Sequence, residues 1–169
     1  LLQPIEQKRF ADAASTPIEL GFHDGHLVTP GGLANTSGID NLLRTYVAQA
    51  RMVADFDKLP IPFRAVATDM VTGKMVVLKN GDLARAMRAS MAIPGAFAPV
   101  VGDGYILADG GMVRNIPVDI ARQTCADVVI AAAVPNPTPE ADDLSSPLTL
   151  VARTLDVLIG ANERQQLER

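Results

Sequence analysis

The sequence predicts an α/β domain in which helices cover the faces of a sheet. Short apolar runs that flank glycine-containing turns predict strands, and the segment after Asp82 has the apolar spacing of a helix. Further along, a proline-initiated helix at residues 118–124 is followed by the continuous apolar run Val128–Val134. Such a run is typical of a strand buried on both faces, and an order of strand, loop, helix and strand favours an α/β sheet.

The composition limits the classes of function. The chain has 169 residues, of which 48% are hydrophobic and 20% charged, which suits a single core. A net charge of −4 and the absence of a basic cluster argue against a nucleic-acid-binding surface. Cys125 is the only cysteine, so an internal disulfide is not expected, and no Cys/His cluster has the spacing of a structural zinc site.

No apolar run approaches the roughly 20 residues that a helix needs to cross a bilayer. The chain also begins with Leu1 rather than Met and has no signal-peptide pattern. We therefore interpret it as part of a longer protein.

The first element expected is a hairpin within residues 18–28, because Asp24-Gly25 between apolar runs favours a tight turn. The turn is flanked by His23 and His26. A solvated hairpin tip is the simpler interpretation of this pair, and a metal or proton-transfer site is the alternative, although no third ligand is recognisable nearby.

A capping box at residues 37–40 predicts a helix from about 38 to 53. Residues 63–68 are expected to form a buried strand, with residues 74–79 as its hairpin partner across Thr72-Gly73. Asp82 is placed to cap a helix over residues 83–91, which Pro94 and Gly95 end.

Two strands, around 97–101 and 105–108, then lead the chain to Asp109-Gly110-Gly111. Residues 135–146 read as a surface loop, and Ser146-Pro147 predicts a final helix over 147–169. Four residues share the apolar face expected of that helix, namely Leu148, Val151, Leu155 and Leu158.

Asp109 is the candidate reactive residue, because a carboxylate at a strand end can be approached closely across two following glycines. The alternative is an Asx turn in which the carboxylate merely bonds its own backbone. Spacing alone leaves both open.

A nucleophile to accompany Asp109 is harder to find. Serine hydrolases commonly present the hydroxyl on a Gly-x-Ser-x-Gly elbow, and the chain contains no such segment. Ser90 is the only serious rival, but it follows a helix rather than introducing one, so it lacks the geometry of an elbow.

Four motifs, in this order, resemble the bacterial patatin-like phospholipases: Asp55 to Asp69, Gly81 to Gly95, Asp109-Gly110-Gly111 with Asn115-Ile116-Pro117-Val118, and Ala126 to Ala131. The resemblance is best over residues 55–133, and residues 1–169 are read as one partial domain. It implies a three-layer patatin-like α/β sheet with helices on both faces, incomplete here at the N-terminal side. An unpaired sheet edge is then expected, which self-association would cover.

The resemblance also implies function. Members hydrolyse acyl esters of phospholipids or lysophospholipids with a Ser-Asp dyad and no histidine. Asp109 is then the general base, supported by Gly110 and Gly111, with no cofactor and no metal. The implied partners are an acyl ester substrate and peripheral contact with a lipid surface. Since the serine elbow would lie upstream, this chain alone is expected to be inactive. A non-catalytic lipid-binding or assembly module with the same fold is the alternative.

Overall fold

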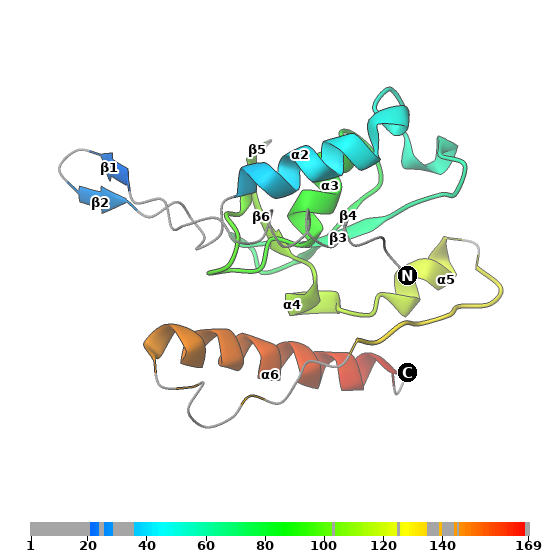
Figure 1. The fold of residues 1–169 in the computed structure, drawn as a ribbon. Helices are drawn as coiled ribbons and strands as arrows, with labels where there is room; N and C mark the ends of the chain where they lie inside the picture. The colour runs from blue at the N-terminus through cyan, green and yellow to red at the C-terminus, as the bar shows by residue number, and fades with distance from the viewer. Residues whose placement is uncertain are drawn as a thin grey trace, which may run out of the picture.

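The computed structural model describes residues 21–23, 26–28, 36–102, 104–124, 126–134, 139, 144 and 146–167. Figure 1 shows the arrangement of its helices and strands. In chain order they are β1 (Gly21–His23), β2 (His26–Val28), α2 (Thr36–Tyr46), η1 (Ala48–Ala50), η2 (Phe56–Lys58), β3 (Ala65–Asp69), β4 (Met75–Leu78), α3 (Leu83–Ser90), β5 (Val100–Gly102), β6 (Tyr105–Asp109), α4 (Gly111–Arg114), α5 (Val118–Gln123) and α6 (Pro147–Leu167).

The described strands form a separate hairpin, β1-β2, and a four-stranded antiparallel sheet in the order β4-β3-β6-β5. Strand β3 lies inside the sheet, and all five of its residues are buried. The predicted hairpin across Thr72-Gly73 is confirmed, with Thr68 opposite Met75 and Gly73 at a φ of 68°. The predicted class, an α/β fold with a sheet and covering helices, is also confirmed.

Helix α3 packs against β3 and β6, and α2 packs on the outer side of α3. Helices α4 and α6 lie on the other side of the sheet in Figure 1, where α6 contacts α4. Small residues bring α3 close to the strands, because Ala86 and Ala89 face Ala65 and Ala67 in the two buried clusters. Phe56 is the largest fully buried side chain, and it anchors the first cluster.

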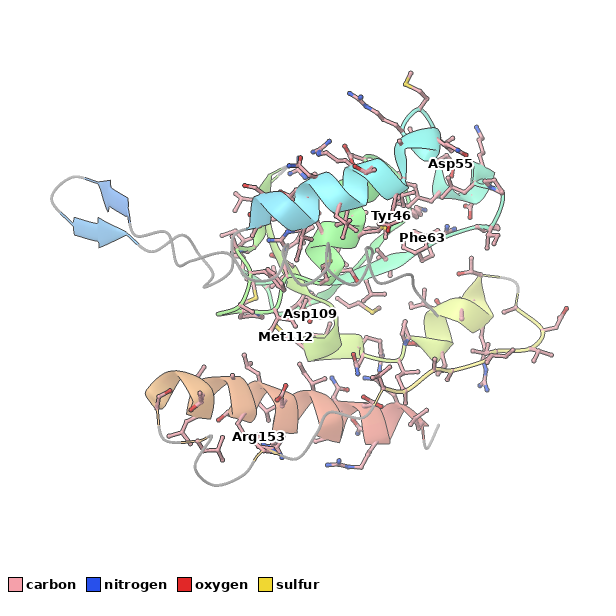
Figure 2. All side chains as sticks on the ribbon, in the orientation of Figure 1. Tyr46, Asp55, Phe63, Asp109, Met112 and Arg153 are labelled. Atoms are coloured by element: carbon pink, nitrogen blue, oxygen red, sulfur yellow. The ribbon has the colours of Figure 1, made fainter. Side chains whose placement is uncertain are left out.

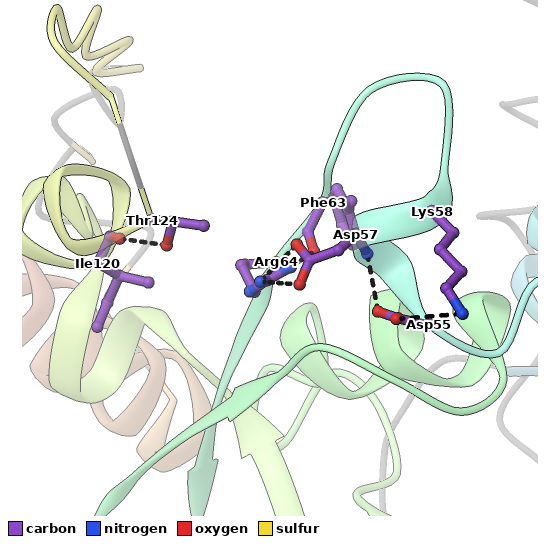
Figure 3. A network of polar contacts seen from close by, with 7 residues as sticks. All are labelled: Asp55, Asp57, Lys58, Phe63, Arg64, Ile120 and Thr124. Carbon is purple, nitrogen blue, oxygen red and sulfur yellow. Dashed lines mark hydrogen bonds and ion pairs between the residues drawn. The ribbon is translucent and has the colours of Figure 1, made fainter.

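Polar contacts hold the segment around Phe56 in place (Figure 3). Asp55 begins the 3₁₀ turn η2 by accepting the backbone N–H of Asp57 at 3.1 Å. Arg64 then binds the Asp57 carboxylate, at 2.6 Å to Oδ1 and 2.8 Å to Oδ2. These contacts link both ends of the segment from Phe56 to Phe63. The ring centroids of Phe56 and Phe63 lie 6.1 Å apart. The turn therefore holds both rings in the core.

Asp82 caps α3 as predicted, since its Oδ1 accepts the backbone N–H of Arg85 at 2.9 Å. Arg88, near the other end of α3, is only 5% exposed. Its guanidinium pairs with Asp40 of α2 at 3.3 Å, donates to the Ala98 carbonyl at 2.8 Å and lies over the Phe97 ring. Arg88 thus ties α2 and the segment after α3 to the same helix.

The expected helix over residues 38–53 is shorter and begins earlier than predicted. It runs over Thr36–Tyr46, so Ser37 lies in its first turn. The chain then tightens, because Ala50 donates its N–H to the carbonyl of Val47, three residues back. A 3₁₀ turn, η1, follows at Ala48–Ala50, and residues 51–53 of the predicted helix are not helical.

The prediction of a doubly buried strand at Val128–Val134 is wrong. These residues are not in a strand, and Val128, Ile130 and Val134 are 79%, 92% and 84% exposed. Burying such a run on both faces requires hydrogen-bonded neighbours and two covering layers. No strand of the described sheet pairs with it, so its apolar character alone does not make it a core strand.

The hairpin near the start of the chain agrees with its prediction, and the last helix agrees in part. The first hairpin is present, with His23 opposite His26, and its Asp24-Gly25 turn lies outside the described residues, as does most of the loop 135–146. Helix α6 starts at Pro147, where Ser146 Oγ accepts the N–H of Thr149. However, its expected apolar face is only partly covered, because Val151 and Leu158 are 59% and 61% exposed whereas Leu155 is half-buried.

Candidate active site

Asp109 is the last residue of β6 and lies between the sheet and α4 (Figure 2). Two hydrogen bonds fix its backbone. Its N–H donates to the carbonyl of Ala92 at 3.0 Å, and its carbonyl accepts the Thr68 hydroxyl at 2.7 Å. Because Thr68 belongs to β3 and Ala92 follows α3, the sheet and the helix above it together set where the Asp109 side chain begins.

The two oxygens of the Asp109 carboxylate have different surroundings. Oδ1 accepts the backbone N–H of Gly111 at 2.7 Å, which is the Asx-type bond considered as the purely structural alternative. Oδ2 has no hydrogen-bond partner within the part of the chain that the structure describes. Desolvation raises the pKa of Asp109 above its ordinary value of 3.8, and the bond from Gly111 opposes part of that rise.

Close packing requires glycine at position 110 and leaves little space beside the backbone at position 111. A β-carbon on Gly110 would collide with the carbonyl of Val66, and one on Gly111 would lie 2.9 Å from Asn115 Oδ1. Gly110 has a φ of −66°, so it does not use left-handed backbone. Gly110 therefore allows the close approach that the sequence predicts, at a backbone conformation open to other residues.

Asp109 lines a cavity of about 840 Å³. The other walls are the turn at residues 93–96, residues 115–116 after α4, the segment 132–134 and part of α6. The α6 face is mixed, with Leu155 and Ile159 beside Arg153 and Glu163. Cavities of this size commonly bind small molecules, with a few polar groups among apolar ones.

No serine, threonine, cysteine or histidine is among the described residues that line this cavity. Ser90 is the last residue of α3, and its Oγ donates to the Val66 carbonyl at 2.7 Å. That hydroxyl therefore joins helix to strand, as expected of a structural serine. Over the described ranges, no group of three metal-binding side chains is present, and no helix is long and apolar enough to span a membrane.

Sequence reasoning missed the residues that hold α6 against α4. Gln166 accepts the backbone N–H of Ile116 at 2.9 Å, and Asn162 donates to the carbonyl of Met112 at 3.2 Å. Glu163 accepts from Asn115 at 2.6 Å. The available signal was the spacing of Asn162 and Gln166, four residues apart and hence on one helix face.

Several curated proteins are similar to part of this chain. An uncharacterized NTE family protein of Mycobacterium tuberculosis is 46% identical over 78 residues, which cover 46% of this chain and 22% of that protein. The mouse patatin-like phospholipase domain-containing protein 7 is 37% identical over 105 residues, which cover 61% of this chain and 7% of that protein. The mouse patatin-like phospholipase domain-containing protein 6 is 41% identical over 90 residues, which cover 52% of this chain and 6% of that protein. The matched segment thus spans less than a quarter of these relatives.

The family model for patatin-like phospholipases matches residues 2–122. That range includes Asp109, both glycines after it and all four strands of the main sheet. It ends before α6, which forms the far wall of the cavity. Because the match covers more than half of the 169 residues, the chain belongs to the patatin-like phospholipase family.

Proposed function

We propose that this chain carries the general base of an acyl ester hydrolase, with Asp109 in that role and the nucleophilic serine contributed from outside the chain. Family membership supports hydrolysis of acyl esters, and the names of the mouse relatives favour phospholipids. The observation that carries the proposal is the Asp109 carboxylate itself. One oxygen is held by Gly111, the other has no hydrogen-bond partner among the described residues, and Asp109 lines the cavity.

In the proposed reaction, Asp109 Oδ2 accepts the proton of the serine hydroxyl while the serine oxygen attacks the acyl carbonyl. The proton then passes to the leaving alcohol, which gives an acyl-enzyme. Water repeats the sequence and releases the fatty acid, regenerating both residues. Gly111 assists by keeping Oδ1 fixed, so that the proton is accepted at one defined oxygen. Partial burial raises the pKa of Asp109, which makes the carboxylate a stronger base than an exposed one.

The substrate would be a phospholipid or lysophospholipid met at a lipid surface, which requires only peripheral membrane contact. The 169 residues alone are proposed to be inactive, since the described cavity wall offers no hydroxyl nucleophile. A lipid-binding module that has lost the chemistry is the competing function.

The test compares the full-length protein with its Asp109→Asn variant on a phospholipid and a short acyl ester. We expect kcat/KM to fall by about 10³-fold, which lies within the range that a positioned general base contributes. Asp127→Asn is the matched control, because Asp127 is exposed and lies outside the cavity lining. Undiminished hydrolysis by Asp109→Asn would refute the role of Asp109. Inactive wild-type protein that still co-sediments with phospholipid vesicles would support the binding module.

A further inference from the structure

Helix α4 is a single turn that immediately follows Asp109 and Gly110. Its four residues allow little hydrogen bonding within the helix, and Val113 and Arg114 both donate to the carbonyl of Gly110, which precedes it. A helix this short is not stable by itself, and the polar groups at its end need partners. The residue that begins α4 is Gly111, whose N–H holds Asp109 Oδ1. Any movement of α4 therefore moves the donor that orients the carboxylate.

The missing partners come from α6, 50 to 53 residues later in the chain. The side-chain amide of Gln166 accepts the Ile116 N–H through Oε1 at 2.9 Å. Through Nε2 it donates to Asn162 Oδ1 at 2.6 Å and, more weakly, to the Val113 carbonyl at 3.5 Å. Asn162 in turn donates to the carbonyl of Met112. Gln166 thus bonds backbone groups on both sides of the end of α4.

Gln166 is only 4% exposed, although it lies near the end of a helix with many exposed side chains. Burying an amide costs free energy unless its hydrogen bonds are made, and here both ends of the amide are bonded. Its neighbour Gln165 is exposed. Adjacent residues of a helix point about 100° apart, so Gln166 faces the segment after α4 while Gln165 faces away, which makes Gln165 a suitable control position.

The strand side of the Asp109 loop is held by other groups. Thr68 and Ala92 bind the backbone of Asp109, and Val66 packs against Gly110. The loop is therefore fixed from two directions, by the sheet at its start and by α6 at its end. Only the second anchor is removable without altering the sheet.

We propose that Gln166 is a positioning residue for the Asp109 carboxylate: its amide holds the end of α4, and through α4 the Gly111 N–H that fixes Oδ1. This inference rests on the proposed function. It also extends the functional unit beyond the range that the family model matches, to a helix that ends 45 residues after residue 122.

The test uses the full-length protein and the variants Gln166→Leu, Gln166→Glu and Gln165→Leu. A phosphonate that reacts covalently with the nucleophilic serine is added until labelling is complete, and the amount bound gives the number of intact active sites. The kcat of each variant is then expressed per labelled site. Gln166→Leu is expected to label completely yet lose about ten- to a hundredfold in kcat with KM unchanged, because small displacements of a catalytic group have effects of this size. Gln166→Glu keeps the acceptor for the Ile116 N–H, so its kcat should lie between those of the wild type and Gln166→Leu. The kcat of Gln165→Leu should match that of the wild type.

A kcat per labelled site within twofold of the wild type in Gln166→Leu would overturn the inference. If Gln166→Leu does not fold, Gln166→Glu decides: full wild-type kcat there would mean that Gln166 serves stability alone. Failure of the proposed function has a different signature, since wild-type protein would then be inactive or Asp109→Asn would stay active.

Discussion

Gly111 donates its backbone N–H to Asp109 Oδ1 over 2.7 Å, so the residue two positions further along orients the carboxylate. One hydrogen bond thus serves two purposes. It closes the turn from β6 into α4, and it leaves Oδ2 as the oxygen that faces no partner among the described residues. The structural and the functional interpretations of Asp109 are therefore compatible.

Replacing Gly110 by alanine should be severely destabilising, whereas Gly160→Ala should stabilise. The new methyl at position 110 would collide with the Val66 carbonyl, a backbone group that cannot rotate away. We expect a loss of about 3 kcal/mol or more. At Gly160 in α6 the nearest atom would be Arg164 Nη1 at 3.8 Å, so alanine should gain about 1 kcal/mol of helix propensity. Denaturant unfolding measures both, and equal effects would contradict the packing argument.

Asp109→Asn should stabilise the fold at neutral pH. Burial raises the pKa of Asp109, so the folded state disfavours the ionised carboxylate relative to the unfolded chain. The fold is most stable while the Asp109 carboxyl is protonated, which holds fully below its ordinary pKa of 3.8. This contribution to stability is lost as the pH rises through the higher pKa of the folded state. Asparagine can still accept from Gly111. The advantage of the variant in free energy of unfolding should therefore appear between acid and neutral pH, and its absence at pH 7 would contradict the prediction.

The opposite pH dependence is expected of Asp69→Asn. Hydrogen bonds from the Thr72 hydroxyl and the Val71 N–H lower the pKa of Asp69 below 3.8. The ionised carboxylate is thus favoured in the fold. Its contribution is present above the unfolded pKa and is lost as pH falls through the lower folded one. The variant should be less stable than the wild type at pH 7 and approach it in strong acid. Thermal unfolding across pH checks this, and a constant difference would contradict it.

Removing the cap of α3 should lower stability by about 1 kcal/mol in Asp82→Ala, because the N–H of Arg85 loses its acceptor. Asp82→Asn is the matched comparison. It retains an oxygen that can cap the helix but lacks the charge that pairs with Arg44 at 3.5 Å. If the cap dominates, asparagine should stay within a few tenths of a kcal/mol of the wild type. Equal losses in both variants would assign the effect to the ion pair instead.

Local rules predicted much of the main sheet. The hairpin across Thr72-Gly73 and the cap at Asp82 are decided by residues close in sequence, so turn and capping preferences suffice to find them. Asp109 was also identified from its neighbours alone, as a carboxylate followed by two glycines. The same rules failed where the outcome depends on distant segments. Residues 128–134 have the composition of a buried strand, yet no described strand pairs with them.

The sequence by itself determined the α/β class, the family resemblance and the candidate base, because each depends on short motifs in a fixed order. The tertiary structure alone decided how that base is held. Val66 against Gly110 and Gln166 against Ile116 join residues 44 and 50 positions apart. Such contacts follow from how the sheet and α6 pack, and hydrophobic periodicity carries no information about which polar side chain will meet which backbone group.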